Sequence, residues 1–162
     1  MLLVFFALFF ILSVTSFCLV VRILLKKIEV EKKMSYKHLQ LYLLMVDWLK
    51  LRQSGNDIAK YLEERGYKNI AIYGMSYAGE CLVEELEDSH IQVSYAIDKN
   101  ADNIFSHIDV LKPDNSLGNV DAVIVTTITA FDGIKELLTE KLSCPVLSLK
   151  NILLEMDTGN GK

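Results

Sequence analysis

Asn69-Ile-Ala-Ile-Tyr-Gly74-Met-Ser-Tyr-Ala-Gly79 is the stretch that decides the fold of this chain. Its first five residues include β-prone Ile and Tyr and predict a buried strand. The segment that follows, from Gly74 to Gly79, is rich in small residues and predicts a tight turn into a helix. Glycine lets the backbone turn sharply and approach a phosphate, which then meets the positive end of the helix. The stretch therefore predicts a strand, a phosphate-binding turn and a helix.

The spacing of the small residues is that of the fingerprint G-x-G-x-x-G, which is typical of dinucleotide-binding Rossmann-type domains. Gly74 and Gly79 occupy the outer positions, and Ser76 replaces the middle glycine. The Ser76 side chain narrows the approach of a pyrophosphate, although its hydroxyl could bond a phosphate oxygen. Two interpretations stay open: a turn kept for packing only, or a phosphate site contacted by Gly74, Met75, Ser76, Tyr77 and Gly79.

Two further positions are candidates for the same site. Asp98 lies 19 residues beyond Gly79 and closes the next expected strand, a spacing that suits the ribose of NAD rather than the extra phosphate of NADP. It could equally be a capping or turn aspartate. Thr126 and Thr127 end a later strand at the edge where open α/β sheets bind ligands, so they either line the pocket or only end the strand.

Strands and helices alternate after residue 55, which predicts an α/β fold with a small Rossmann-like parallel sheet. The right-handed crossover rule favours the strand order 3-2-1-4-5. A capped helix at 58–65 precedes the sheet, and a helical turn at 152–156 and a disordered tail at 157–162 follow it. The expected strands are 69–73, 91–97, 107–110, 120–127 and 145–148, and the expected helices between them are 77–87 and 130–141.

The amino-terminal segment from Leu2 to Val21 carries no charged residue. Twenty helical residues span roughly 30 Å, the thickness of a bilayer core, so we expect a transmembrane anchor within residues 1–25. A cleaved signal peptide is the alternative, but no Lys or Arg precedes the apolar run, as such peptides require.

Charge predicts the orientation of the anchor and excludes one class of partner. Residues 22–54 hold eight Lys or Arg against three acidic residues, and residues 55–162 hold nine against eighteen. Basic flanks stay in the cytoplasm, which predicts a single-pass protein of the cell membrane with its amino terminus outside and its domain, 55–156, in the cytoplasm. The acidic domain offers no basic groove, so nucleic acid is not an expected partner.

The segment between anchor and domain, residues 26–54, combines this basic collar with an amphipathic helix at 37–52. Leu39, Leu43, Val46 and Leu49 recur at helical spacing. This apolar stripe could pack on the domain, on the membrane surface or on a second copy of the chain.

No residue pattern predicts catalysis or a metal site. The three Cys and three His residues are scattered without ligand spacing. Tyr95 and Lys99 have the spacing of a dehydrogenase Tyr–Lys pair, but they fall across a strand end and a loop, so we interpret the spacing as coincidence. Tyr73 and Tyr77 are interpreted as packing residues, and the run Glu84, Glu85, Glu87 and Asp88 as a solvated helix face.

The segments 73–79, 95–100 and 120–126 together resemble Rossmann-like modules of bacterial surface-polysaccharide biosynthesis proteins. Similar modules are appended to glycosyltransferases, form the amino-terminal domain of sugar acyltransferases and occur in membrane-bound sugar epimerase-dehydratases. The resemblance covers roughly residues 55–155. It implies a nucleotide, a dinucleotide such as NAD, or a nucleotide-sugar as ligand, and a glycan-assembly enzyme as partner.

The resemblance therefore suggests an accessory or regulatory module that does not catalyse a reaction by itself, because the catalytic domains of these relatives have no counterpart in the sequence. One alternative is a subunit of an NAD-dependent nucleotide-sugar epimerase or oxidoreductase. Another is a ligand-free scaffold that forms a homo-oligomer through the helix at 37–52.

Overall fold

The computed structural model describes residues 1–159, which fall into two units, Met1–Leu39 and the part from Gln40 onward. Helix α1 (Leu2–Gln53) begins in the first unit and ends in the second. Its amino-terminal part is long and apolar enough to cross a membrane by length and composition, and none of that part is buried within the protein. The first unit thus presents an apolar helix surface from Leu2 to Val21 and a charged one from Arg22 onward.

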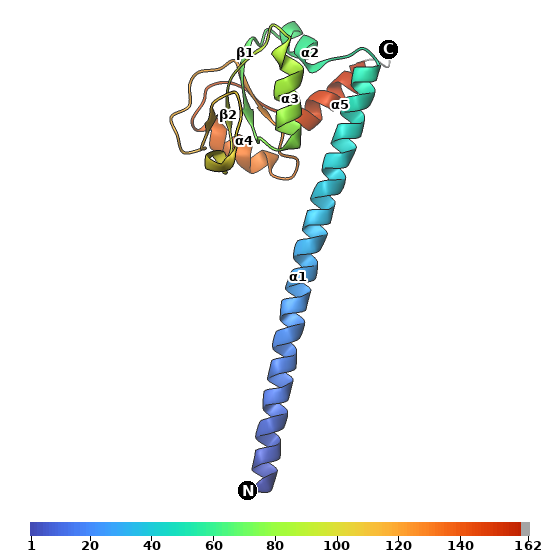
Figure 1. Cartoon of the computed structure of the whole chain (residues 1–162), viewed down its shortest axis with the longest axis vertical. Coiled ribbons are helices and arrows are strands. Elements are labelled where there is room, and N and C mark those ends of the chain that lie inside the picture. Colours follow the sequence, from blue (N-terminus) through green and yellow to red (C-terminus); the bar gives the residue numbers. More distant parts are fainter. Residues whose placement is uncertain (160–162) are drawn as a thin grey trace. The chain divides into compact units, whose positions relative to one another are not determined.

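The second unit is built on a sheet of five parallel strands in the order β3-β2-β1-β4-β5, which confirms the predicted fold class and strand order. Figure 1 shows β1 and β2 beside each other, with α3 next to them. The four residues of β4 are all buried, as expected of a strand covered on both faces. The strands are β1 (Asn69–Tyr73), β2 (Gln92–Ile97), β3 (Val110–Leu111), β4 (Ala122–Val125) and β5 (Val146–Ser148).

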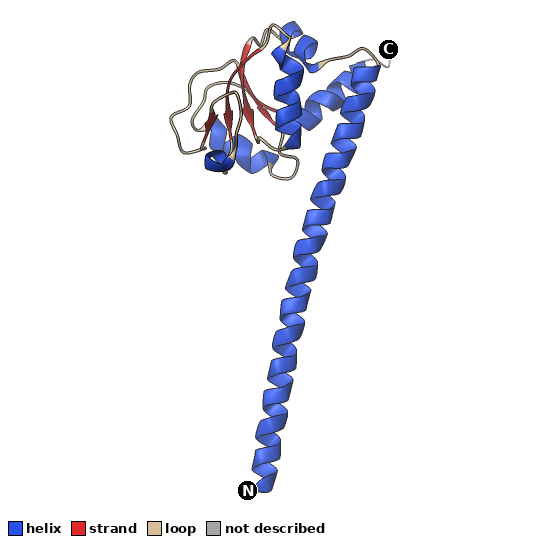
Figure 2. Ribbon diagram, in the orientation of Figure 1, coloured by secondary structure: helices blue, strands red, loops and turns tan. Residues whose placement is uncertain are grey.

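Helices cover the two faces of the sheet unequally. Alternate strand residues such as Ile70 and Ile72 pack against α2 (Ile58–Glu64), α3 (Tyr77–Glu87), α5 (Leu149–Gly159) and the end of α1. The other set, including Ala71 and Tyr73, packs against α4 (Phe131–Thr139) and the segment that follows β3. Figure 2 shows the strands between α3 and α4. One face is therefore covered by parts of four helices and the other by one.

Several elements differ from the expected bounds. Strand β3 begins at Val110 rather than at 107, because it pairs only with Ala96 and Ile97 at the edge of the sheet. Strand β4 ends before Thr126, whose side chain turns back to β1. A short 3-10 helix, η1 (Ala101–Asn103), follows β2.

The end of the chain is more helical than the sequence suggested. Helix α5 begins at Leu149 and continues to Gly159, since Leu149, Ile152 and Leu153 are buried in the core. The residues 157–159, which we expected in a disordered tail, belong to this helix, and residues 160–162 lie outside the described part.

The last turns of α1 belong to the domain. Leu44, Trp48 and Leu51 are at most 5% exposed and join the core cluster, so the amphipathic helix packs on its own domain along this side. The second unit accordingly begins at Gln40, whereas the sequence suggested residue 55. Leu43 and Leu49 remain exposed on the same helix.

Glu85 joins three helices and is the exception in its acidic run, whose Glu84, Glu87 and Asp88 are exposed as expected. Its side chain is 8% exposed. One carboxylate oxygen accepts a hydrogen bond from the indole Nε1 of Trp48 at 2.7 Å, and the other accepts the amide of Ile58, the first residue of α2, at 3.0 Å. The guanidinium of Arg52 lies 3.5 Å from the second oxygen. One carboxylate thus holds α1, α2 and α3 together.

We expect Glu85→Ala to lower the free energy of unfolding by about 3 kcal/mol, because it leaves the buried Trp48 and Ile58 donors without an acceptor. Trp48 is the chain's single tryptophan, so its fluorescence during urea unfolding of the detergent-solubilised chain measures the effect. The exposed neighbour Glu84 provides the control, and Glu84→Ala should change stability by less than about 0.5 kcal/mol. Equal effects of the two substitutions would contradict the role given to Glu85.

Candidate functional site

The turn after β1 is held by hydrogen bonds from both neighbouring strands. Gly74 has a φ of 100°, a backbone conformation that glycine adopts easily, and its amide donates to the carbonyl of Ile97 at the end of β2. The Thr126 hydroxyl donates to the carbonyl oxygen of Gly74 at 2.6 Å. Thr126 is buried, so its hydroxyl fixes the turn to β4 instead of facing a ligand.

Both fingerprint glycines are required by packing alone. A Cβ atom on Gly79 would lie 2.1 Å from the carbonyl oxygen of Gly74. A Cβ atom on Gly74 would lie 2.7 Å from the hydroxyl oxygen of Thr126 and 2.8 Å from that of Thr127. Gly79 therefore explains the close approach of α3 to the turn, and Gly74 the close approach of the residues after β4, without reference to a ligand.

The amino terminus of α3 is nevertheless open to an anion. Ser76 is the N-cap, and its side chain makes no capping hydrogen bond. Within residues 1–159, no protein acceptor is found for the amides of Ser76, Tyr77 and Ala78. Ala78 is fully buried, so only Ser76 and Tyr77 are exposed residues with an unpaired amide. Ser76 and Tyr77 are exposed, and Tyr77, at 74% exposure, is not the packing residue that we expected. Unpaired amides and the helix dipole favour a negative charge at this position.

Asp98 supports the turn from the end of β2. One of its carboxylate oxygens accepts the amide of Met75 at 2.9 Å, and the other accepts the amide of Asn100 at 2.8 Å. The turn-aspartate role that we had left open is therefore present in the structure. Each oxygen keeps a free lone pair, so a contact with a ribose hydroxyl stays a prediction.

A cavity of about 530 Å³ lies next to this turn, on the α4 side of the sheet. Its polar lining comes from the residue before Gly74, from the residue after Asp98 and from the segment after β3: Tyr73, Lys99, Lys112 and Asp114. Pro113 and the first half of α4, from Ala130 to Leu137, contribute the remaining wall. The cavity thus lies at the carboxyl ends of β1, β2 and β3, where open parallel sheets bind ligands.

Tyr73 lines this cavity, but its hydroxyl is buried and sealed from solvent. The residue is 4% exposed, and its hydroxyl is the one buried side-chain oxygen or nitrogen among the described residues that has no hydrogen-bond partner. Burial, and secondarily the negative charge of Asp98, raises the pKa of the phenol above its ordinary value. The hydroxyl is therefore protonated at neutral pH and can donate. Buried polar groups in proteins rarely lack a partner.

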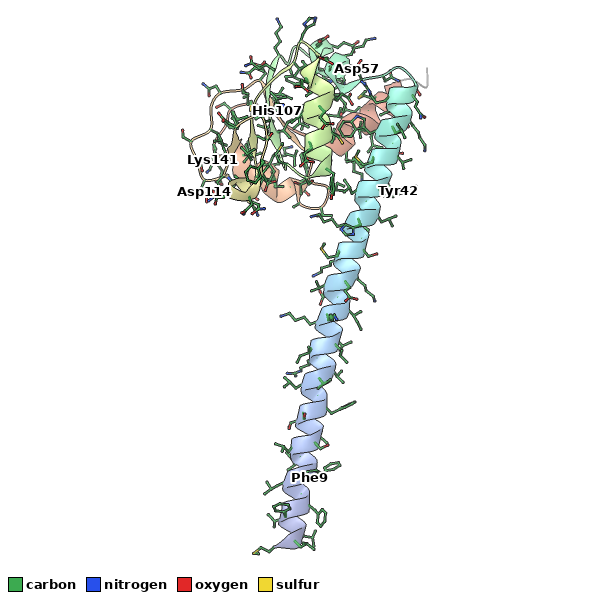
Figure 3. All side chains as sticks on the ribbon, viewed as in Figure 1. Phe9, Tyr42, Asp57, His107, Asp114 and Lys141 are labelled. Carbon is green, nitrogen blue, oxygen red and sulfur yellow. The ribbon has the colours of Figure 1, made fainter. Side chains whose placement is uncertain are left out.

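Charged groups surround the mouth of the cavity. The ammonium of Lys112 lies 2.5 Å from Asp102 of η1, and Lys99 is exposed. Lys141 lies outside the lining and donates to the carbonyl of Pro113 at 2.5 Å, which fixes the segment after β3. Figure 3 shows Asp114 and Lys141 on the same side of the domain.

The eight sequence-predicted site residues gather around one turn, but they do not share one role. Ser76 and Tyr77 face solvent, and Met75, Asp98 and Thr126 hold the turn in place. Thr127 is half-buried beside Gly74. The sequence analysis missed the cavity residues Tyr73, Lys99, Lys112 and Ile134. Tyr73, Lys99 and Lys112 lie at or just after the end of a strand, and this position is the signal that could have found them. Ile134 lies on α4, the helix that follows β4.

The Tyr95–Lys99 spacing does not produce a pair in the structure. The Tyr95 hydroxyl donates to the carbonyl of Gly118 at 2.6 Å, so Tyr95 does not pair with Lys99. Within residues 1–159, no group of three or more His, Cys, Asp or Glu residues could hold a metal ion. The geometry suits binding of an anionic ligand with an uncharged, partly apolar portion.

Comparison with known proteins gives no relative for this chain: no family model, curated protein or solved structure matches it.

We expect Gly79→Ala to destabilise the domain by more than about 3 kcal/mol, because the new Cβ cannot avoid the backbone oxygen of Gly74. Gly133 in α4 is the matched control: a Cβ there meets nothing within 4 Å, so Gly133→Ala should stabilise by about 0.5–1 kcal/mol. Thermal unfolding of the two variants measures the difference. A well-folded Gly79→Ala protein would contradict the close approach of α3.

Proposed function

We propose that the domain binds a nucleotide, a dinucleotide or a nucleotide-sugar, with the ligand's phosphates at the amino terminus of α3. The observation that carries this proposal is the combination of open α3 amides with an adjacent cavity at the carboxyl edge of the sheet. The amides of the exposed residues Ser76 and Tyr77 supply donors for an anion, and no protein acceptor is found for them within residues 1–159. Gly74 and Gly79 do not support the proposal, because packing alone already requires glycine at both positions.

The cavity favours a ligand that extends beyond its phosphates. It is lined by Tyr73 and Lys99, which directly adjoin Gly74 and Asp98 in the chain. An inorganic phosphate would leave about 530 Å³ unfilled. A nucleotide carries both an anion for the amides at the start of α3 and a bulky group for the cavity, so it fits better than inorganic phosphate does.

We propose a binding role rather than catalysis. The Tyr73 phenol has a raised pKa, which makes it a poor proton acceptor at neutral pH, and the Tyr95 hydroxyl is already bonded. An accessory or regulatory module in bacterial surface-polysaccharide assembly agrees with the sequence resemblance and with a membrane-spanning amino-terminal helix. In this proposal the helix anchors the domain on the cytoplasmic side of the cell membrane.

Ser76 allows a test that leaves the packing intact. We expect Ser76→Asp to weaken binding of the nucleotide that the unaltered chain prefers by at least about tenfold, because a carboxylate would meet the phosphates. Both Asp and the control Ser76→Asn are good N-caps, so neither should unfold α3. The measurement is thermal stabilisation of the full chain in detergent by NAD, NADP, ADP, UDP and UDP-sugars. A nucleotide that protects all three proteins equally would place the phosphates elsewhere.

Single cysteines test the proposed orientation of the anchor. We expect a cysteine at Asn115, an exposed position after β3, to react with a membrane-impermeant maleimide only after the cells are permeabilised. A cysteine placed in a short polar extension added before Leu2 should react in intact cells. Both variants are made after Cys18, Cys81 and Cys144 are replaced by serine. The reverse labelling pattern is expected if the basic flank and the domain lie outside the cell, so it would contradict a cytoplasmic domain.

A further inference from the structure

We propose that the domain pairs with a second copy of the chain through the outer side of α1 and the adjoining side of α5. The sequence alone allowed three partners for the apolar stripe of α1: the domain, the membrane surface and a second copy. The domain takes one side of the helix through Leu44, Trp48 and Leu51. Only the other side still needs a partner, and the choice is independent of any ligand at the α3 turn.

The side of α1 that faces away from the core is also apolar. A helix turns by about 100° per residue, so Tyr42, Val46 and Leu49 share one face, which we call the outer strip. Tyr42 is 65% exposed, Leu49 is 58% exposed and Val46 is half-buried. The core residues Leu44 and Trp48 lie on the opposite face of the same turns. The domain therefore covers only one of two apolar sides.

A groove between α1 and α5 adjoins the outer strip. Figure 1 shows α5 beside the last turns of α1, and the groove between them has a volume of about 310 Å³. Its lining includes the buried side chains of Leu44, Leu51 and Leu153. Leu43 of α1 and Leu154 of α5 also line it, and they are 45% and 51% exposed. The groove and the strip thus form one apolar surface with contributions from two helices.

The charges around the groove favour a second copy as its occupant. Two exposed aspartates and two exposed lysines line it, one of each from either helix: Asp47, Lys50, Lys150 and Asp157. In a twofold pair the same surface of both copies meets, so each contact occurs twice with the roles exchanged. A rim with equal numbers of both signs can then place lysines opposite aspartates on both sides. A strongly acidic or basic partner would find no such match.

The same charges disfavour the membrane surface. Helices that lie on a bilayer carry mainly Lys and Arg beside their apolar face, which attract anionic lipids. Here Asp47 and Asp157 line the groove in the same number as the lysines, and an anionic bilayer would repel them. Of the two partners left for this side of α1, the second copy therefore fits better.

The size of the surface indicates where pairing occurs. A standard stable interface uses about 20–30 residues per partner, and the outer strip and the groove together provide fewer. The proposed membrane anchor compensates, because it confines all copies to one plane and one orientation and so raises their effective concentration. Pairing should accordingly be strong in membranes and weaker in dilute detergent.

Cysteine cross-linking in membranes tests the pairing. The full chain without its three native cysteines, as used for the labelling above, receives a single cysteine. We expect Leu154→Cys to be cross-linked to a dimer by a short bismaleimide in membranes of cells that express it. Phe105→Cys is the matched control, since Phe105 is a fully exposed apolar residue on the loop after η1, outside the proposed surface. Equal cross-linking of the two variants would indicate random collisions and would overturn the proposal.

A second substitution shows whether the outer strip takes part. We expect Leu49→Glu to reduce the cross-linked fraction of Leu154→Cys at least about fivefold, because it places a carboxylate from each copy in the apolar interface. Phe105→Glu adds the same charge elsewhere and should leave cross-linking unchanged. The fluorescence of Trp48 during urea unfolding verifies that both variants stay folded. An undiminished dimer in the folded Leu49→Glu variant would overturn the role of the strip.

The remaining outcomes identify another occupant. Cross-linking of Leu154→Cys only to a different membrane protein would overturn pairing with a second copy. Quenching of a fluorophore on this cysteine by nitroxide-labelled lipids, without a dimer, would assign the surface to the bilayer and would also overturn it. None of these measurements uses a nucleotide, so their failure is distinct from failure of the proposed function.

Discussion

The carbonyl oxygen of Gly74 is the atom on which the arrangement of the sheet edge depends. It accepts the Thr126 hydroxyl, and it stands where only a glycine at position 79 lets α3 approach. The left-handed backbone of Gly74 directs this carbonyl, while Asp98 holds the next amide, that of Met75. Strands β1, β2 and β4 and helix α3 therefore meet at one turn. These contacts hold the turn but supply no hydrogen-bond acceptor to the amides of Ser76 and Tyr77 at the start of α3.

This arrangement explains how packing and binding can share one motif. A glycine fingerprint is usually explained by the approach of a pyrophosphate, yet here the approach of α3 to a backbone oxygen already requires Gly79, and the Thr126 and Thr127 hydroxyls leave no room for a side chain at Gly74. Ser76, at the middle position, is exposed and has no packing neighbour that would exclude a side chain. Support for the proposed ligand thus comes from the unpaired amides of Ser76 and Tyr77 and from the adjacent cavity, rather than from the motif.

The sequence predicted the architecture well because alternation of β-prone and amphipathic segments is a local property. It predicted the parallel sheet, its strand order and the turn at Gly74. It did not predict the burial of Glu85, because the partners Trp48 and Ile58 are distant in sequence and belong to other helices. It interpreted Tyr73 as a packing residue, which its burial confirms, but the missing hydrogen-bond partner of its hydroxyl is visible only in three dimensions. The length of α5 depends on tertiary burial of Ile152 and Leu153, which weak local propensity could not indicate.

The unequal covering of the sheet has a consequence for local stability. On one face, α1, α2, α3 and α5 are cross-linked through Glu85 and through the Tyr61–Glu155 hydrogen bond, whereas α4 alone covers the other. Amides of α4 should accordingly exchange with solvent through openings of lower free energy than those of α3. The cavity lies against this less protected helix, so a bound molecule would hold α4 closed and slow its exchange. Binding in the cavity would then change how often α4 opens, while the arrangement of the strands in the sheet stays the same.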